Sequence, residues 1–202
     1  MTRLAAFLFV IFLLTALSFA QSEDRKPTLS KDRLTSEQVA VYRAFLRFYA
    51  KGSDRVLYVA DRTDWLGASD IKEDADCSRS FGQIEFDEPK GSGPTIHRLD
   101  SSLAIAGRIA LVDSASQSEK VRQNDPSKTM REGKPVDRAV SDAFTSALLT
   151  LSEIVFDKNH HKAAMSFSFA CGRLCGSTAI VMLKQVGRHW KVTEESCGGG
   201  VS

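Results

Sequence analysis

The chain lacks the short motifs that accompany several common enzyme chemistries. It has no Gly-x-Ser-x-Gly nucleophile elbow and no Cys-x-x-Cys pair. Its glycine-rich stretch at 91–94 is not followed by the Gly-Lys-Ser/Thr that a phosphate-binding loop requires. The sequence therefore gives no support to a serine-elbow hydrolase, a thioredoxin-like enzyme or a P-loop nucleotide-binding protein. We expect no bound cofactor.

An excess of charge of one sign is also missing. The 202 residues include 27 Lys and Arg against 25 Asp and Glu, a net charge of +2. A nucleic-acid-binding domain is expected to be basic and to cluster its cations, so this balance argues against a nucleic-acid partner. Hydrophobic residues make up 43% and charged residues 26%, which are ordinary values for a folded domain.

One apolar run stands out, and it is too short for a transmembrane helix. It covers residues 4–14, follows the single cation Arg3, and ends in a segment with Ser18 and Ala20 at −3 and −1 of a cut before Gln21. A membrane-spanning helix needs about 20 apolar residues, whereas the apolar core of a signal peptide has about 7–15. We expect residues 1–20 to be a cleaved signal peptide that leaves no membrane span. The expected location is secreted or periplasmic.

The remaining chain is short enough for one domain. Residues 21–34 are polar without apolar periodicity and are expected to form a flexible lead-in. Residues 35–202 are expected to form a single α+β domain. Thr35 and Gln38 match a capping box and predict a helix near 36–51.

A second helix is predicted near 136–149. Apolar residues recur there at helical spacing, which predicts a helix facing the core. The stripe consists of Val136, Val140, Ala143, Phe144, Ala147, Leu148 and Leu151. Strands are expected within 55–60 and 108–112. The sequence does not predict the other secondary structure of residues 61–113.

The C-terminal third predicts an antiparallel β-meander. Apolar residues occupy odd positions on successive strands, and aligning these faces places Met165 opposite Val181 and Leu183 opposite Val192. The same register puts Cys171 directly opposite Cys175. The two predicted helices are expected to cover this odd-numbered face, giving an α+β fold.

Four cysteines allow three disulfide pairings. They are Cys77, Cys171, Cys175 and Cys197. Export favours disulfides over free thiols. The strand register favours Cys171–Cys175, and Cys77–Cys197 then follows by elimination, but the sequence alone does not fix the connectivity.

The sequence leaves two functional hypotheses open, a metal-binding protein and a hydrolase. A metal could be held by three of these cysteines with His160, His161 or His189, although the register places the histidines at the opposite strand ends. A hydrolase could use the 61–113 segment, with His97, Asp100 or Asp113 as acid and base. No sequence motif supports either reading.

The C-terminal region resembles a pattern found in uncharacterised secreted proteins of bacteria. The residues that carry the likeness are Cys171-Gly172-x-Leu174-Cys175-Gly176 and Gly187-x-x-Trp190-Lys191. The resemblance implies export and a bacterial origin and transfers no activity. The sequence as a whole therefore predicts an exported, non-enzymatic domain that binds an unknown ligand or an envelope protein.

Overall fold

The computed structural model describes residues 26–82, 84–87, 93–105 and 107–201. Its helical elements are α2 (Ser36–Tyr49), α3 (Ala68–Glu73), α4 (Ala75–Phe81), the short 3-10 helix η1 (Ser101–Leu103), α5 (Ser114–Gln123), α6 (Pro126–Arg131) and α7 (Val136–Ser146). Its strands are β1 (Thr28–Leu29), β2 (Leu57–Ala60), β3 (Thr95–Ile96), β4 (Ile109–Val112), β5 (Leu148–Leu151), β6 (Val155–Phe156), β7 (Lys162–Gly172), β8 (Cys175–Val186) and β9 (His189–Val201).

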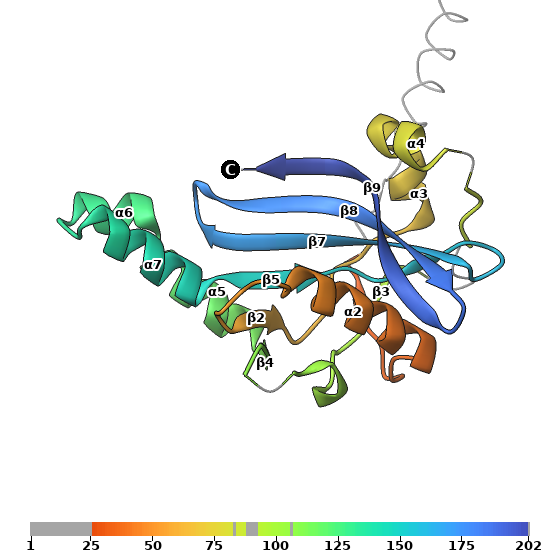
Figure 1. Ribbon diagram of the computed structural model, residues 1–202, viewed down its shortest axis with the longest axis horizontal. Coiled ribbons are helices and arrows are strands. Elements are labelled where there is room, and N and C mark those ends of the chain that lie inside the picture. Colours follow the sequence, from red (N-terminus) through yellow and green to blue (C-terminus); the bar gives the residue numbers. More distant parts are fainter. Residues whose placement is uncertain (1–25, 83, 88–92, 106, 202) are drawn as a thin grey trace, which may run out of the picture.

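One seven-stranded sheet organises the molecule (Figure 1). Its order is β4-β2-β5-β7-β8-β9, and β6 pairs with the beginning of β7. The strands from β5 onward are antiparallel, as the α+β prediction requires. The pairs β2–β4 and β2–β5 are parallel, a half of the sheet that the sequence did not predict.

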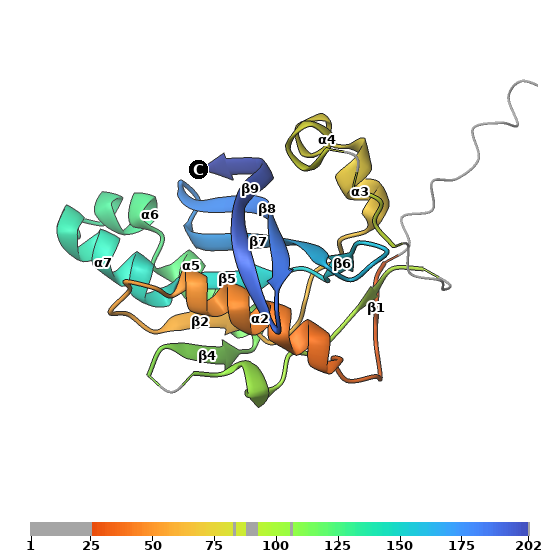
Figure 2. The ribbon, with the colours of Figure 1, turned by 45° about the vertical axis from the view of Figure 1, so that its right-hand side comes forward.

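Helix α2 covers one face of this sheet and crosses beside the β8–β9 hairpin (Figure 2). The predicted capping box is present: the Thr35 hydroxyl accepts from the Gln38 backbone N–H, and the Gln38 side chain accepts from the Thr35 N–H. The helix buries Val41, Tyr42, Phe45 and Leu46 against the odd-numbered face of β7 and its neighbours. This contact forms the main hydrophobic core.

The opposite face is covered by other helices at two places. Helix α5 buries Val121 against Ala60 of β2 and Leu148 of β5. Helices α3 and α4 pack on Ala164 and Met182 of β7 and β8, in a second apolar cluster. Helices cover both faces over much of the sheet. For this reason, not all of its strands show a simple alternation of apolar and polar residues.

Helix α7 differs from the prediction in its end and in its packing. The helix stops at Ser146, and Leu148–Leu151 form β5 instead of continuing the helix to 149. Three residues of the expected core-facing stripe, Val136, Val140 and Phe144, are exposed at 61%, 39% and 41%. Its other residues are buried: Ala143, Ala147, Leu148 and Leu151. The face of α7 that is buried is the alanine face, which meets α6, α5 and the end of β7.

The register predicted for the meander is largely confirmed. Met165 pairs with Val181, and Leu183 pairs with Val192. Near the β7–β8 turn, however, the ladder passes from Ala170–Gly176 to Gly172–Cys175, so Cys171 occupies a β-bulge. It therefore does not lie directly opposite Cys175 in the β-ladder, and the strand register predicted for these two residues is wrong.

The bulge depends on a glycine. Gly172 has a φ of 148°, and a Cβ atom at this position would lie 2.7 Å from Cδ of Pro126. A side chain is therefore excluded both by the backbone conformation and by the close approach of α6.

Part of the expected flexible lead-in is structured. Strand β1 runs parallel to β3, and the Thr28 N–H donates to the carbonyl of Pro94 at 3.0 Å. The expected signal peptide at 1–20 lies outside the described residues. Within the described ranges, no helix is long and apolar enough to cross a membrane.

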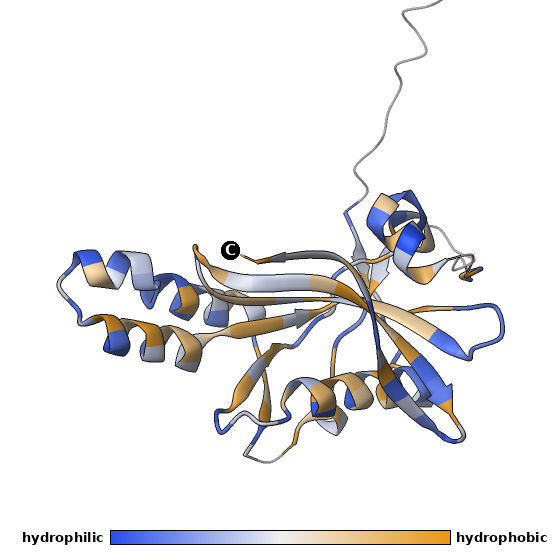
Figure 3. Ribbon diagram, turned by 45° about the horizontal axis from the view of Figure 1, so that its top comes forward, coloured by the Kyte–Doolittle hydropathy of each residue, from blue (hydrophilic) through white to orange (hydrophobic). Residues whose placement is uncertain are grey.

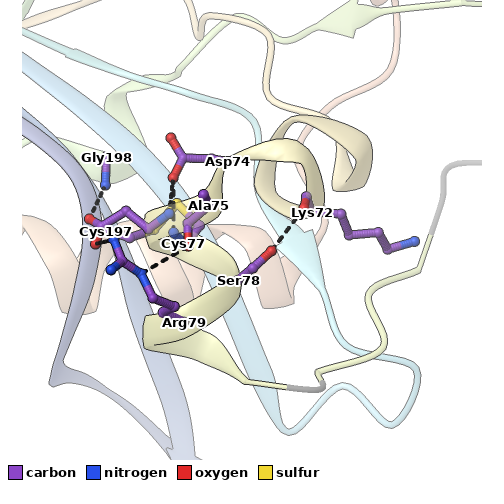
Figure 4. The surroundings of a disulfide bond; sticks show 9 residues. Lys72, Asp74, Ala75, Cys77, Ser78, Arg79, Cys197 and Gly198 are labelled. Atoms are coloured by element: carbon purple, nitrogen blue, oxygen red, sulfur yellow. Dashed lines mark hydrogen bonds and ion pairs between the residues drawn. A yellow bond between two sulfur atoms is a disulfide. The ribbon is translucent and has the colours of Figure 1, made fainter.

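Two disulfides complete the fold. Cys171 bonds Cys175 across the β7–β8 turn, and Cys77 of α4 bonds Cys197 of β9. Around the second bond, Asp74 caps α4 by accepting from the Cys77 N–H, and the Gly198 N–H donates to Asp76 (Figure 4). The bond thereby fixes the 61–82 region to the last strand.

Candidate ligand-binding site

The residues proposed for a hydrolase do not form one site. Asp100 caps η1 by accepting from the Ser102 N–H at 2.7 Å, and Asp113 caps α5 by accepting from the Ser116 N–H at 2.8 Å. Hydrogen bonds from these partners lower the pKa of each carboxyl group. Both aspartates are therefore occupied as helix caps, and among the described residues neither is hydrogen-bonded or ion-paired with His97.

His97 has a different partner, Glu153. Its ring Nδ1 lies 2.9 Å from Glu153 Oε2, and its backbone N–H donates to Glu153 Oε1 at 2.8 Å. The hydroxyl of Thr63 also donates to Oε1. This cluster ties three segments of chain together in the interior. The cluster therefore has the geometry of a structural crosslink.

Glu153 was not among the candidate residues, although the sequence held a signal for it. It is a lone carboxylate in the apolar stretch 148–156. A charged residue in such a stretch must be paired when the strand is buried. The signal predicts that a partner exists but does not identify His97, which is 56 residues away.

Tyr42 lies beside this cluster and ties α2 to it. Its hydroxyl donates to the Ser152 carbonyl at 2.8 Å. Burial, and secondly the negative charge of Glu153, raise the pKa of Tyr42 well above the ordinary value of 10.0. The folded protein therefore keeps this proton at a pH where the unfolded chain releases it.

The shifted pKa predicts a loss of stability in alkali. As pH rises above about 10, the unfolded state binds fewer protons than the folded state, so the free energy of unfolding should fall by up to about 1.4 kcal/mol per pH unit. Tyr42→Phe should remove this contribution while costing about 1 kcal/mol at neutral pH for the lost hydrogen bond. Urea unfolding of both proteins between pH 7 and about 11 measures the difference. Parallel pH profiles would contradict the assignment.

Residues proposed as metal ligands also have other partners in the structure. All four cysteines are in disulfides. His160 Nδ1 lies 2.8 Å from Glu37 Oε2, and its ring stacks on Phe156 with centroids 4.8 Å apart. Among the described residues, no group of three or more His, Cys, Asp or Glu side chains is arranged to hold a metal ion.

The strongest candidate site is an aromatic pocket at the junction of α2, β2, α7 and β7. It has a volume of about 350 Å³, within the range of small-molecule sites. Its lining residues include Tyr49, Tyr58, Phe144 and Phe169. The Tyr49 and Phe169 centroids are 6.3 Å apart, and those of Phe144 and Phe169 are 6.1 Å apart. These distances fit mutually supporting aromatic contacts, so the wall is built before any ligand arrives.

A few polar groups lie among these rings. The Arg55 guanidinium sits over the Phe144 ring, 5.6 Å from its centroid, in a cation–π contact. In the described part of the chain Arg55 has no carboxylate within ion-pair distance. Burial raises the pKa of Tyr49, while a hydrogen bond with Ser177 acts in the opposite direction. The pocket thus combines an apolar wall, neutral hydroxyls and one uncompensated cation.

The sequence did not locate this pocket, for an identifiable reason. Phe144 was assigned to a core-facing stripe, and Arg55 to the start of a strand. Their meeting depends on the point where α7 stops and β5 begins, because this turn brings the end of α7 over β2.

A scan against models of known protein families, a search of curated proteins and a search of solved structures each return no match to the chain.

Proposed function

We propose that the protein is an exported, non-enzymatic binding domain whose aromatic pocket takes a small apolar molecule with one anionic group. The observation that carries the proposal is Arg55, an unpaired cation held over the aromatic wall of a pocket of about 350 Å³. Aromatic walls with few polar groups are typical of small-molecule sites. The lone cation selects a carboxylate or a similar anion at one end of the ligand.

The pocket suits this role because its parts are fixed in advance. Phe144 is held between Phe169 and Arg55, so the guanidinium need not be ordered when a ligand binds. Preorganisation of this kind reduces the entropy lost on binding. The apolar end of the ligand would contact the rings, and its anionic end would replace water around Arg55.

Export is part of the proposal. It is supported by the leader-like residues 1–20 and by the two disulfides, because disulfides persist in oxidising compartments. A secreted or periplasmic binding domain would meet its ligand at the cell envelope.

The test uses a matched pair of ligands, 4-phenylbutyrate and the neutral 4-phenyl-1-butanol. Calorimetric titration should show tighter binding of the carboxylate. Arg55→Met should weaken carboxylate binding by about tenfold or more, because a charge-assisted contact contributes about 1.5–3 kcal/mol. The alcohol should bind both proteins equally.

The control is Arg79→Met, which removes an exposed cation of α4 far from the pocket residues. It should leave both affinities unchanged. If Arg55→Met binds the carboxylate as well as the unchanged protein does, or if neither compound binds, the proposal is wrong.

A further inference from the structure

A second hollow, of about 550 Å³, lies between the outer side of α2 and the hairpin end of β9. Its cationic side chains are Arg43 and Arg47 of α2 and Arg188 and Lys191 at the hairpin. None of the described residues that line it is an Asp or a Glu. Figure 3 shows hydrophilic residues concentrated on this hairpin. The near-zero net charge of the chain therefore conceals a local cluster of cations.

A row of lysines lies on the face of the sheet turned away from α2, because the neighbouring Leu183 and Trp190 pack in the core with α2. Lys162 of β7 pairs with Lys184 of β8, and Lys184 pairs with Lys191 of β9. Like charges directly opposite each other on neighbouring strands destabilise a sheet. Within the described ranges, none of these lysines lies within ion-pair distance of a carboxylate. The row is a local cost to folding that an external anion would relieve.

Apolar side chains accompany the cations. Phe48 lines the same hollow and is 58% exposed, and Val186 at the hairpin turn is 42% exposed. Val186 pairs with His189, so it lies with Lys184 on the hairpin face turned away from α2 and does not line the hollow. A soluble anion would gain nothing from the exposed Phe48 ring. Exposed apolar groups among cations are the combination that favours the interface of an anionic membrane.

We propose that this basic hairpin surface, formed by Arg43, Arg47, Phe48, Arg188 and Lys191, docks the protein on an anionic lipid bilayer. The cations would contact the phosphates of the lipid headgroups, and Phe48 would enter the interfacial layer. Electrostatic attraction is screened over about 8–10 Å in physiological salt, so only the face turned to the membrane contributes. The balanced charge of the remaining surface does not oppose the contact. The proposal is independent of the aromatic pocket, because Arg55 is not part of this surface.

Co-sedimentation with lipid vesicles tests the proposal, using the chain that begins at Gln21. The protein should bind vesicles of mixed phosphatidylglycerol and phosphatidylcholine, should not bind phosphatidylcholine alone, and should dissociate as salt is raised. Arg47→Glu with Arg188→Glu should weaken binding by at least about thirtyfold, taking about 1 kcal/mol for each cation near the surface. Phe48→Ser should weaken binding less while keeping the dependence on salt.

The matched control is Lys120→Glu with Arg131→Glu, which makes the same change of net charge on α5 and α6. It should bind vesicles as the unchanged protein does. All four replaced cations are exposed, so thermal unfolding should show that both variants remain folded. Equal weakening by the two double variants would overturn the proposal. Absence of vesicle binding, combined with binding to heparin, to a nucleic acid or to glycerol phosphate in solution, would assign the surface to a soluble anion and would also overturn it.

Discussion

Replacing Cys77 and Cys197 together with alanine is expected to lower the free energy of unfolding by about 4–5 kcal/mol. The bond joins residues 120 positions apart, so it removes a large number of conformations from the unfolded chain. Both cysteines are buried, and they lie in the apolar cluster between α3, α4 and the sheet. Urea unfolding at neutral pH measures the loss.

The second disulfide provides the matched comparison. Cys171 and Cys175 are only four positions apart, so the same chain-entropy relation gives about 2 kcal/mol for their replacement by alanine. The long-range bond should therefore have about twice the effect. Equal losses in the two double variants would show that loop length does not determine the stabilisation, and that local packing around the sulfur atoms dominates.

Local pattern was sufficient to predict the pairing of β7 with β8 and the turn end of the β8–β9 hairpin, but not the register shift after which Val181 pairs with Ser196. Alternation of apolar residues fixes which faces of β7 and β8 must align, because a shift of one residue would expose one set. Met165 and Val181 pair for this reason. The pattern could not reveal the bulge at Cys171, since the bulge arises where Gly172 meets Pro126 of α6, an encounter between distant segments.

The parallel half of the sheet depends on non-local pairing, which periodicity does not encode. Val59 of β2 pairs with Leu149 of β5, about 90 residues later. Apolar residues at 148–151 fit a continued helix as well as a buried strand, because a short apolar run does not distinguish the two. The change from helix to strand occurs at Ala147, which has a ψ of 151° and ends α7.

The two surfaces proposed for binding were hidden for a related reason. Composition averages charge over the whole molecule, so a net charge of +2 gave no indication that Arg47 and Arg188 line one hollow. Likewise, Arg55 and Phe144 are remote in sequence and meet only in the fold. Helical spacing correctly predicted that Phe144 shares a helix face with Val140, but not that this face would be exposed.

The largest effect expected of a single substitution is at Glu153. Its carboxylate accepts from the His97 backbone N–H and from the Thr63 hydroxyl, and it contacts the His97 ring. The side chains of His97 and Glu153 are only 17% and 9% exposed. Glu153→Ala would remove the charged acceptor shared by the His97 ring, the His97 N–H and the Thr63 hydroxyl, leaving the N–H only Thr63 Oγ1 and the hydroxyl only the His97 carbonyl. The free energy of unfolding should therefore fall by about 3–5 kcal/mol.

A double-mutant cycle separates this cause from simple loss of packing. His97→Ala removes the ring but leaves Glu153 its contacts with Thr63 and the backbone, so it should cost less than Glu153→Ala. If the pair is coupled, the double variant should be more stable than the sum of the two losses predicts. Glu119→Ala, which breaks an exposed pair with Arg122, is the control and should leave the urea midpoint unchanged, because exposed ion pairs contribute little. Additive losses at 97 and 153 would show that the cluster acts through packing alone, and the crosslink between the three segments would then have to be assigned to their backbone hydrogen bonds.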